Sequence, residues 1–148
     1  MASLEKATPK TILVVDDEQD VLILLKLILE TSGYRALLAP GAETALKLLG
    51  QDDLKVDLLL TDVVMPGMSG TELARVSREL RPDLPILFMT GFADTEAVRL
   101  KVWDDTVQLL RKPFTEEVFI AEICKLLGAV PLPTTPPEHV QRASSLEV

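Results

Sequence analysis

The sequence contains only one cysteine, Cys124, among its 148 residues. A single cysteine excludes an internal disulfide framework, and its place in a helical pattern favours a small packing residue over a reactive thiol. A chain without disulfides suits a reducing compartment. Cysteine usage therefore predicts a cytoplasmic protein.

Long apolar runs are also absent. The longest one, at residues 21–29, is interrupted by Lys26 and is far too short to span a bilayer. Residues 1–10 contain no apolar stretch of the kind found in signal peptides. We therefore expect a soluble protein that does not insert into a membrane.

An excess of basic residues is lacking too. Lysine and arginine total 15 against 23 aspartates and glutamates, which leaves a formal net charge of −8, and no run of lysine or arginine occurs. Nucleic acids and anionic membrane surfaces attract positive charge. Direct binding to either is therefore disfavoured.

The sequence does contain a regular alternation of strand-type and helix-type patterns. Hydrophobic residues make up 47% of the chain and charged residues 26%, which is a normal mixture for one globular domain with a sizeable core. Apolar runs predict strands at 11–15, 34–38, 56–61, 86–89 and 107–111. Apolar residues at helical spacing predict helices at about 21–29, 42–49, 69–80 and 115–127. A further helix is predicted at about 94–103, where the apolar residues form no clean stripe.

Alternating strands and helices are typical of a parallel sheet with right-handed crossovers. We predict an α/β fold, a doubly wound five-stranded parallel sheet of flavodoxin-like order 2-1-3-4-5 with helices on both faces. The domain should span residues 10–128. Residues 1–9 are expected to form an N-terminal extension, and the proline-rich residues 129–148 a flexible tail.

Two of the predicted helices carry clear start signals. Residues 69–72 match a capping box, and the helix that Ser69 begins should bury Leu73, Val76 and Leu80. Thr115 is placed to cap the last helix, with acidic residues in the first turn where they favour the helix dipole.

The first helix carries more apolar residues than one buried face requires. The face predicted to be buried consists of Val21, Leu24, Leu25, Ile28 and Leu29. Ile23 and Leu27 would then lie one turn apart on the exposed side, with Leu22 at the border. Scattered surface leucines are common, but an apolar patch rimmed by charge usually marks a partner site. We predict that this face binds a protein partner or a second copy of the chain; a homodimer could also use the face of the fourth helix and fifth strand.

Polar side chains follow four of the predicted strands: Asp16 and Asp17 the first, Asp62 the third, Thr90 the fourth and Lys112 the fifth. The carboxyl ends of parallel strands share one edge of a sheet, so these groups should converge there. Each of them alone has an ordinary explanation as a helix cap, a turn residue or a solvated charge. Acids, a hydroxyl and an ammonium at one edge are together typical of a phosphoryl-transfer site.

With these residues the chain resembles the receiver domains of two-component response regulators. The likeness covers residues 10–128 and rests on the five polar residues above, on the stretch TDVVMPGMSG at 61–70 and on KPF at 112–114. The stretch at 61–70, with MTGFAD at 89–94, also resembles receivers attached to hybrid sensor kinases. The resemblance implies a bacterial phosphoprotein of a two-component or phosphorelay pathway, either free or part of a hybrid kinase.

The resemblance also implies a phosphorylation site and a metal site. Asp62 is expected to accept a phosphoryl group from a phosphohistidine of a sensor kinase or a histidine phosphotransfer protein. Asp17, Asp62 and the backbone carbonyl of Val64 would bind Mg²⁺ directly and Asp16 through water, in keeping with the preference of this ion for hard oxygen ligands.

Thr90 and Lys112 complete the implied site, because a hydroxyl and an ammonium can each contact a phosphoryl oxygen. Such a domain is no enzyme beyond catalysing its own phosphorylation and dephosphorylation. It would act by changing its partner contacts or by passing the phosphoryl group on, without a DNA-binding output domain. The position three residues before Lys112, often aromatic in the family, is Leu109 here, so a switch should use Thr90 and the loop at 91–93.

Two other functions compete with this interpretation. Aspartyl-phosphate hydrolases of the haloacid dehalogenase type also use a strand-end aspartate and Mg²⁺, but their motif is Asp-x-Asp, whereas residues 16–18 supply adjacent acids. A degenerate receiver that serves only as a docking scaffold is the second alternative. The presence of all five expected polar residues argues against it.

The side chains flanking the implied site predict slow loss of the phosphoryl group from Asp62. Val64 and Phe92 lie two residues after Asp62 and Thr90, and neither side chain can hold or orient an attacking water. A Val64→Asn, Phe92→Glu double variant should therefore lose the group faster than the wild type, measured as decay of the phosphoprotein mass after donor removal. Equal or slower decay in the double variant would contradict the prediction.

Overall fold

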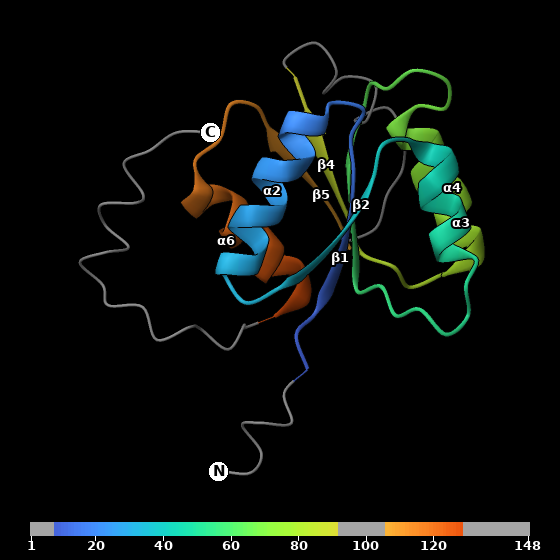
Figure 1. Ribbon diagram of the computed structural model, residues 1–148, viewed down its shortest axis with the longest axis horizontal. Helices are drawn as coiled ribbons and strands as arrows, with labels where there is room; N and C mark the ends of the chain where they lie inside the picture. Colours follow the sequence, from blue (N-terminus) through green and yellow to red (C-terminus); the bar gives the residue numbers. More distant parts are fainter. Residues whose placement is uncertain (1–7, 92–105, 129–148) are drawn as a thin grey trace.

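The computed structural model describes residues 8–91 and 106–128 of the chain. At the centre of these residues is a parallel sheet in the order β2-β1-β3-β4-β5 (Figure 1). The strands are β1 Thr11–Val15, β2 Arg35–Ala39, β3 Leu58–Asp62, β4 Ile86–Thr90 and β5 Val107–Arg111. The predicted strand order is confirmed, and every strand begins and ends within two residues of its predicted bounds.

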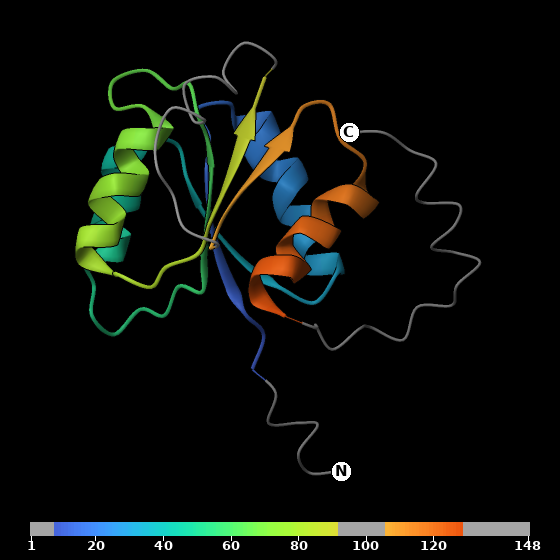
Figure 2. The same ribbon diagram turned by 180° about the vertical axis from the view of Figure 1, so that it is seen from behind.

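Helices cover both faces of the sheet. Those in the described segments are α2 Gln19–Thr31, α3 Ala42–Leu49, α4 Gly70–Leu80 and α6 Glu116–Leu127. Helices α2 and α6 lie on one face and α3 and α4 on the other, as Figures 1 and 2 show from opposite sides. The doubly wound α/β arrangement is therefore confirmed. The helix predicted at 94–103 lies outside the described residues.

Successive side chains of each strand supply the two hydrophobic cores that these helices cover. On β1, Leu13 and Val15 join the cluster beneath α3 and α4, whereas Ile12 and Val14 join the cluster beneath α2 and α6. Every residue of β1 and of β4 is buried, because both faces of a central parallel strand are covered. This packing fixes the positions of the strand ends that carry the polar residues.

The predicted helix starts are confirmed by their caps. Ser69 Oγ accepts a hydrogen bond from the backbone N–H of Glu72 at 3.2 Å, and Thr115 Oγ1 accepts one from Val118 at 3.2 Å. Each bond satisfies an amide that has no partner within its own helix. Gly128 ends α6 with φ 85°, a conformation that favours glycine.

The buried face of α2 differs from the prediction. Leu22, placed at the border, is 2% exposed, and Leu24, expected in the core, is 39% exposed. Most sides of this helix are apolar, so two neighbouring stripes fit the helical period equally well. Packing against the sheet and against Phe119 and Ile123 of α6 selects the stripe that contains Leu22. Leu22 therefore cannot belong to an exposed partner surface.

The buried face of α4 was predicted correctly at Leu73 and wrongly at Leu80, which is 48% exposed. Val76 is half-buried, and the buried positions are taken by the small residues Ala74 and Ser77. Small side chains allow α4 to lie close beside α3. The buried Ser77 hydroxyl donates to the carbonyl of Leu73 at 2.7 Å, which satisfies it within the helix.

The helices are short. The longest described one, α2, has 13 residues, whereas a bilayer-spanning helix needs about 20. Within the segments that the structure describes, no helix is long and apolar enough to cross a membrane. Residues 1–7 of the predicted extension and the whole of the predicted tail lie outside those segments.

Candidate functional site

The sheet brings the predicted polar residues to one edge. This edge carries Asp16 and Asp17 after β1, Asp62 at the end of β3, Thr90 at the end of β4 and Lys112 after β5. The parallel registers of β1 with β3, β3 with β4 and β4 with β5 set these strand ends beside one another. Residues separated by almost a hundred positions in the sequence thus share one site.

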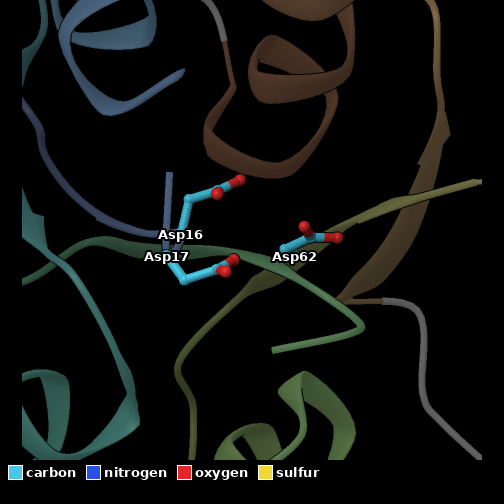
Figure 3. Close-up of side chains that lie close together, drawn as sticks. All are labelled: Asp16, Asp17 and Asp62. Carbon is cyan, nitrogen blue, oxygen red and sulfur yellow. The ribbon is translucent and has the colours of Figure 1, made fainter. Parts of the chain in front are cut away.

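The three aspartates form the centre of this site. One carboxylate oxygen from each of Asp16, Asp17 and Asp62 lies within 4.8 Å of the other two. Figure 3 shows the three side chains close together, two from the segment after β1 and one from β3. Like charges at this spacing repel one another, and a cation among them would relieve the repulsion. The three acids therefore form an acidic pocket that can bind a metal ion.

Asp16 is the buried member of the three, with 1% of its surface exposed. Its Oδ1 accepts a hydrogen bond from the backbone N–H of Glu18 at 2.8 Å, whereas Oδ2 is buried and has no hydrogen-bond partner among the described residues. Burial raises the pKa of the Asp16 carboxyl above its ordinary value; the Glu18 amide and Lys112 oppose this rise, and the carboxylates of Asp62 and Asp17 add to it. A buried carboxylate oxygen without a partner is an acceptor that a cation or its bound water would satisfy.

The donor set suits a hard divalent cation. Mg²⁺ prefers carboxylate and carbonyl oxygens and retains several waters, which a pocket with an exposed Asp17 and a partly exposed Asp62 accommodates. Val64, whose carbonyl is the remaining predicted ligand, is 59% exposed and belongs to the loop that follows Asp62. The part that this carbonyl plays in metal binding stays a prediction.

Lys112 supplies positive charge to the same edge. Its Nζ donates a hydrogen bond to Asp62 Oδ2 at 3.3 Å, with 38% of the lysine side chain and 13% of the aspartate side chain exposed. Its backbone N–H donates to the carbonyl of Thr90 at 2.9 Å, and its peptide bond to Pro113 is cis. Lys112 therefore contacts the carboxylate at the end of β3 and the backbone at the end of β4.

Thr90 is fully buried at the end of β4. Its hydroxyl donates to the carbonyl of Gly91 at 2.7 Å, the start of the loop that was predicted to act in a switch. Phe92 and the rest of that loop lie outside the described residues. Leu109, at the position where the family often has an aromatic ring, is half-buried and packs against the cluster beneath α3 and α4.

Thr61 and Gly70 contact the backbone of Asp62. Neither residue is among those that the sequence predicts for the site. The Thr61 hydroxyl donates to the Asp62 carbonyl at 2.9 Å, and Gly70 approaches the same carbonyl so closely that a side chain there would collide with it. From the sequence, Gly70 belongs to a capping box and to the stretch at 61–70, and neither assigns it a contact with Asp62. Its distance from Asp62 depends on the path by which the loop at 63–69 leads back toward the end of β3, and no local sequence pattern specifies that path.

The chain matches known proteins over most of its length. The model of the response regulator receiver domain matches residues 12–124. The response regulator receiver protein CpdR of Brucella abortus is 40% identical over 123 residues, which cover 81% of this chain and 98% of CpdR. The sensor kinase CckA of the same organism is 31% identical over 128 residues, which cover 84% of this chain but only 14% of the kinase.

A solved structure supports the same likeness. The response regulator receiver protein from Sinorhizobium medicae has a TM-score of 0.72 and 30% sequence identity, covering 82% of this chain and 96% of that one. The relatives thus include a protein hardly longer than the matched segment and a kinase in which the segment is a small part. Both architectures that the sequence resembles are represented.

Substitution of the buried aspartate should stabilise the metal-free protein and reduce the stabilisation that metal provides. A raised pKa means that the contribution of Asp16 to folding is most favourable below its ordinary pKa and is lost as pH rises through the raised value. In EDTA at neutral pH, Asp16→Asn should therefore increase the free energy of unfolding, by an amount that shrinks as the pH falls to about 4. Added Mg²⁺ should stabilise the wild type more than the variant.

Denaturant titrations with and without Mg²⁺ measure both effects. Asp52→Asn, which changes an exposed acid outside the pocket, is the matched control and should show neither. An Asp16→Asn variant that is less stable than the wild type in EDTA and gains as much from Mg²⁺ would refute the assignment.

Proposed function

The chain belongs to the response regulator receiver domain family, and we propose that within a two-component pathway it accepts a phosphoryl group on Asp62 from a phosphohistidine. Receiver domains are phosphorylated by histidine kinases, and the donor here would be a histidine kinase or a histidine phosphotransfer protein. The observation that carries the proposal is the position of Asp62. It stands at the end of β3 with its carboxylate partly exposed, beside two further acids and in contact with Lys112.

The proposed reaction transfers the group from nitrogen to oxygen. A carboxylate oxygen of Asp62 attacks the phosphorus in line with the bond to the imidazole nitrogen. The new P–O bond forms as the P–N bond breaks, and the electron pair of that bond stays with the imidazole, which takes up a proton. The products are an acyl phosphate on Asp62 and a free histidine on the donor.

The negative charge of the pocket opposes the approach of a phosphoryl group. Lys112 is already within hydrogen-bond distance of Asp62 and can pair with one phosphoryl oxygen. We infer that Asp17, Asp62 and the carbonyl of Val64 would hold Mg²⁺ directly, with Asp16 bound through water. The buried Asp16 Oδ2, which has no hydrogen-bond partner in the part of the chain that the structure describes, supports this choice. When bound, Mg²⁺ supplies the positive charge that neutralises the phosphoryl oxygens.

Thr90 is proposed to bind another phosphoryl oxygen. Its hydroxyl now donates to the carbonyl of Gly91, and rotation of one side-chain bond would release it. Because that carbonyl lies in the loop after β4, the exchange of partners would change the loop when Asp62 is phosphorylated. This is the change that we propose in place of a rotating aromatic ring at Leu109.

The proposed output is a change in protein contacts or onward transfer of the phosphoryl group. The receiver family is a signalling family and not a classical enzyme family. Its signature runs from residue 12 to residue 124 and accounts for the described fold, which leaves the hydrolase alternative without support. The bacterial relatives and the lone Cys124 support a cytoplasmic location.

Phosphorylation should depend on Asp62 and on the metal pocket. With a small-molecule phosphodonor and Mg²⁺, the wild type should gain the mass of one phosphoryl group, whereas Asp62→Asn should gain none. Asp17→Ala should lose both Mg²⁺ binding and the reaction, because it removes a predicted ligand without touching the acceptor. Intact-mass spectrometry gives the result, with Asp52→Asn as the control that should react like the wild type.

Each failure of that experiment has a distinct meaning. A wild type that gains no mass would identify the chain as a docking scaffold. An Asp62→Asn variant that reacts with wild-type kinetics would place the acceptor elsewhere. Turnover of small phosphate esters into free phosphate would revive the hydrolase.

We further propose that the donor docks on the α2 patch, defined as Ile23, Leu24 and Leu27. Their exposed fractions are 55%, 39% and 63%. Leu22 does not belong to the patch because it is buried. Helix α2 starts at Gln19, directly after the acidic pocket, so Ile23 lies about 6 Å along the helix from the end beside the site. A partner seated there would stand next to Asp62. The alternative dimer face combines β5, which the structure describes, with the helix predicted at 94–103, which lies outside the described residues.

Charge on the α2 patch should slow transfer from a protein donor only. Ile23→Lys with Leu27→Lys removes apolar contact area, so phosphotransfer from a histidine-phosphorylated protein should slow by at least about tenfold, while the reaction with a small phosphodonor stays unchanged. Leu80→Lys, at an exposed leucine on the opposite layer, is the matched control. Unchanged transfer rate and unchanged oligomeric mass in the double variant would mean that the patch is ordinary surface.

A further inference from the structure

The carboxyl end of β3 touches the start of α4 through backbone atoms. A methyl group built on Gly70 would lie 2.0 Å from the carbonyl oxygen of Asp62, 2.9 Å from its carbonyl carbon and 2.9 Å from Cα of Val63. Real Cβ atoms essentially never come closer than 3.0 Å to another heavy atom. The obstacle is backbone and not the end of a flexible side chain. Any residue larger than glycine must therefore push α4 and Asp62 apart.

Gly70 meets no other demand that only glycine could satisfy. Positive φ occurs at Gly33, Gly67 and Gly128 but not at Gly70. Glycine is also a poor residue within a helix, because it loses more conformational freedom than alanine. The space beside Asp62 is the remaining requirement.

Three hydrogen bonds hold the backbone from the carbonyl of Asp62 to the carbonyl of Val63. The N–H of Gly70 donates to the carbonyl of Val63 at 2.7 Å, and the N–H of Val63 donates to the carbonyl of Met89 on β4 at 3.1 Å. From the core side, the fully buried Thr61 hydroxyl donates to the Asp62 carbonyl at 2.9 Å. The backbone of the residue that carries the acceptor carboxylate is thus fixed by a helix, a neighbouring strand and a buried hydroxyl.

We propose that Gly70 is a positioning residue for the phosphorylation of Asp62, with Thr61 as its counterpart on the core side. Because Gly70 has no side chain, the start of α4 can contact the backbone carbonyl of Asp62 directly. The same contact closes the base of the loop at 63–69, which carries Val64. An alanine methyl would force a displacement of about 1 Å, and a misplacement of that size can cost roughly 100-fold in rate. This inference rests on the proposed function of Asp62.

The test compares two glycines that begin helices. Gly70→Ala should slow phosphorylation by a small phosphodonor about 100-fold and weaken Mg²⁺ binding to the unphosphorylated protein. Gly41→Ala is the matched control, because Gly41 precedes α3 and a Cβ there meets nothing within 4 Å. Rates are expressed per folded molecule, with the folded fraction measured by circular dichroism and the Mg²⁺ dissociation constant by calorimetry. A loss of stability alone leaves both quantities unchanged in the molecules that remain folded.

Thr61 provides a second test that does not depend on the folding of the Gly70 variant. Thr61→Val keeps the shape and removes the hydroxyl, so phosphorylation should slow about fivefold, the equivalent of one hydrogen bond. Thr61→Ser should restore the rate because it restores the donor. If Gly70→Ala fails to fold, the Thr61 pair decides the question.

Two results would overturn the proposal. One is a folded Gly70→Ala protein that reacts and binds Mg²⁺ like the wild type; the other is wild-type behaviour of Thr61→Val. A wild type that is not phosphorylated on Asp62 is instead a failure of the proposed function. In that case the Mg²⁺ affinities of the Gly70 and Gly41 variants still decide whether Gly70 positions the pocket.

Discussion

Repulsion among three neighbouring carboxylates is the constraint on which the rest of the structure depends. The oxygens of Asp16, Asp17 and Asp62 lie within 4.8 Å of one another, and the burial of Asp16 makes its ionisation more costly. A parallel sheet can sustain this arrangement because its strands are covered on both faces and hold their ends in place. Lys112 offsets part of the charge, and a cation bound among the carboxylates would offset the remainder.

The same edge of the sheet connects the candidate site to segments at the protein surface. Thr90 ends β4 with its hydroxyl on the carbonyl of the next residue, and the backbone N–H of Lys112 bonds to the Thr90 carbonyl. Any rearrangement of these two residues around a phosphoryl group therefore acts on the start of the loop after β4. On the other side of the site, α2 begins immediately after the aspartate pair and exposes apolar side chains within its first two turns.

The strands, the described helices and the polar residues of the site could be predicted because each has a local signal, and the strand order followed from the alternation of strands and helices along the chain. Apolar runs, caps such as Ser69 and Thr115, and acids at strand ends are properties of short segments. The exposed sides of α2 and α4 were harder to predict from the sequence. Leu22 and Leu24 are chemically equal neighbours, and Leu80 fits the helical period as well as Ala74 does, so only the contacts with α6, α3 and the sheet decide which side is buried.

The sequence by itself determined that this is a doubly wound domain with acids, a hydroxyl and a lysine at one edge of its sheet, because apolar periodicity and the residue types at strand ends can be read without knowing any distance. Tertiary structure alone decided three further matters: that one buried oxygen of Asp16 has no partner among the described residues, that Lys112 contacts Asp62, and that Gly70 lies against the Asp62 carbonyl. Each depends on the path of a loop or on the separation of two elements. Such distances arise from the packing of the whole domain, and no single segment encodes them.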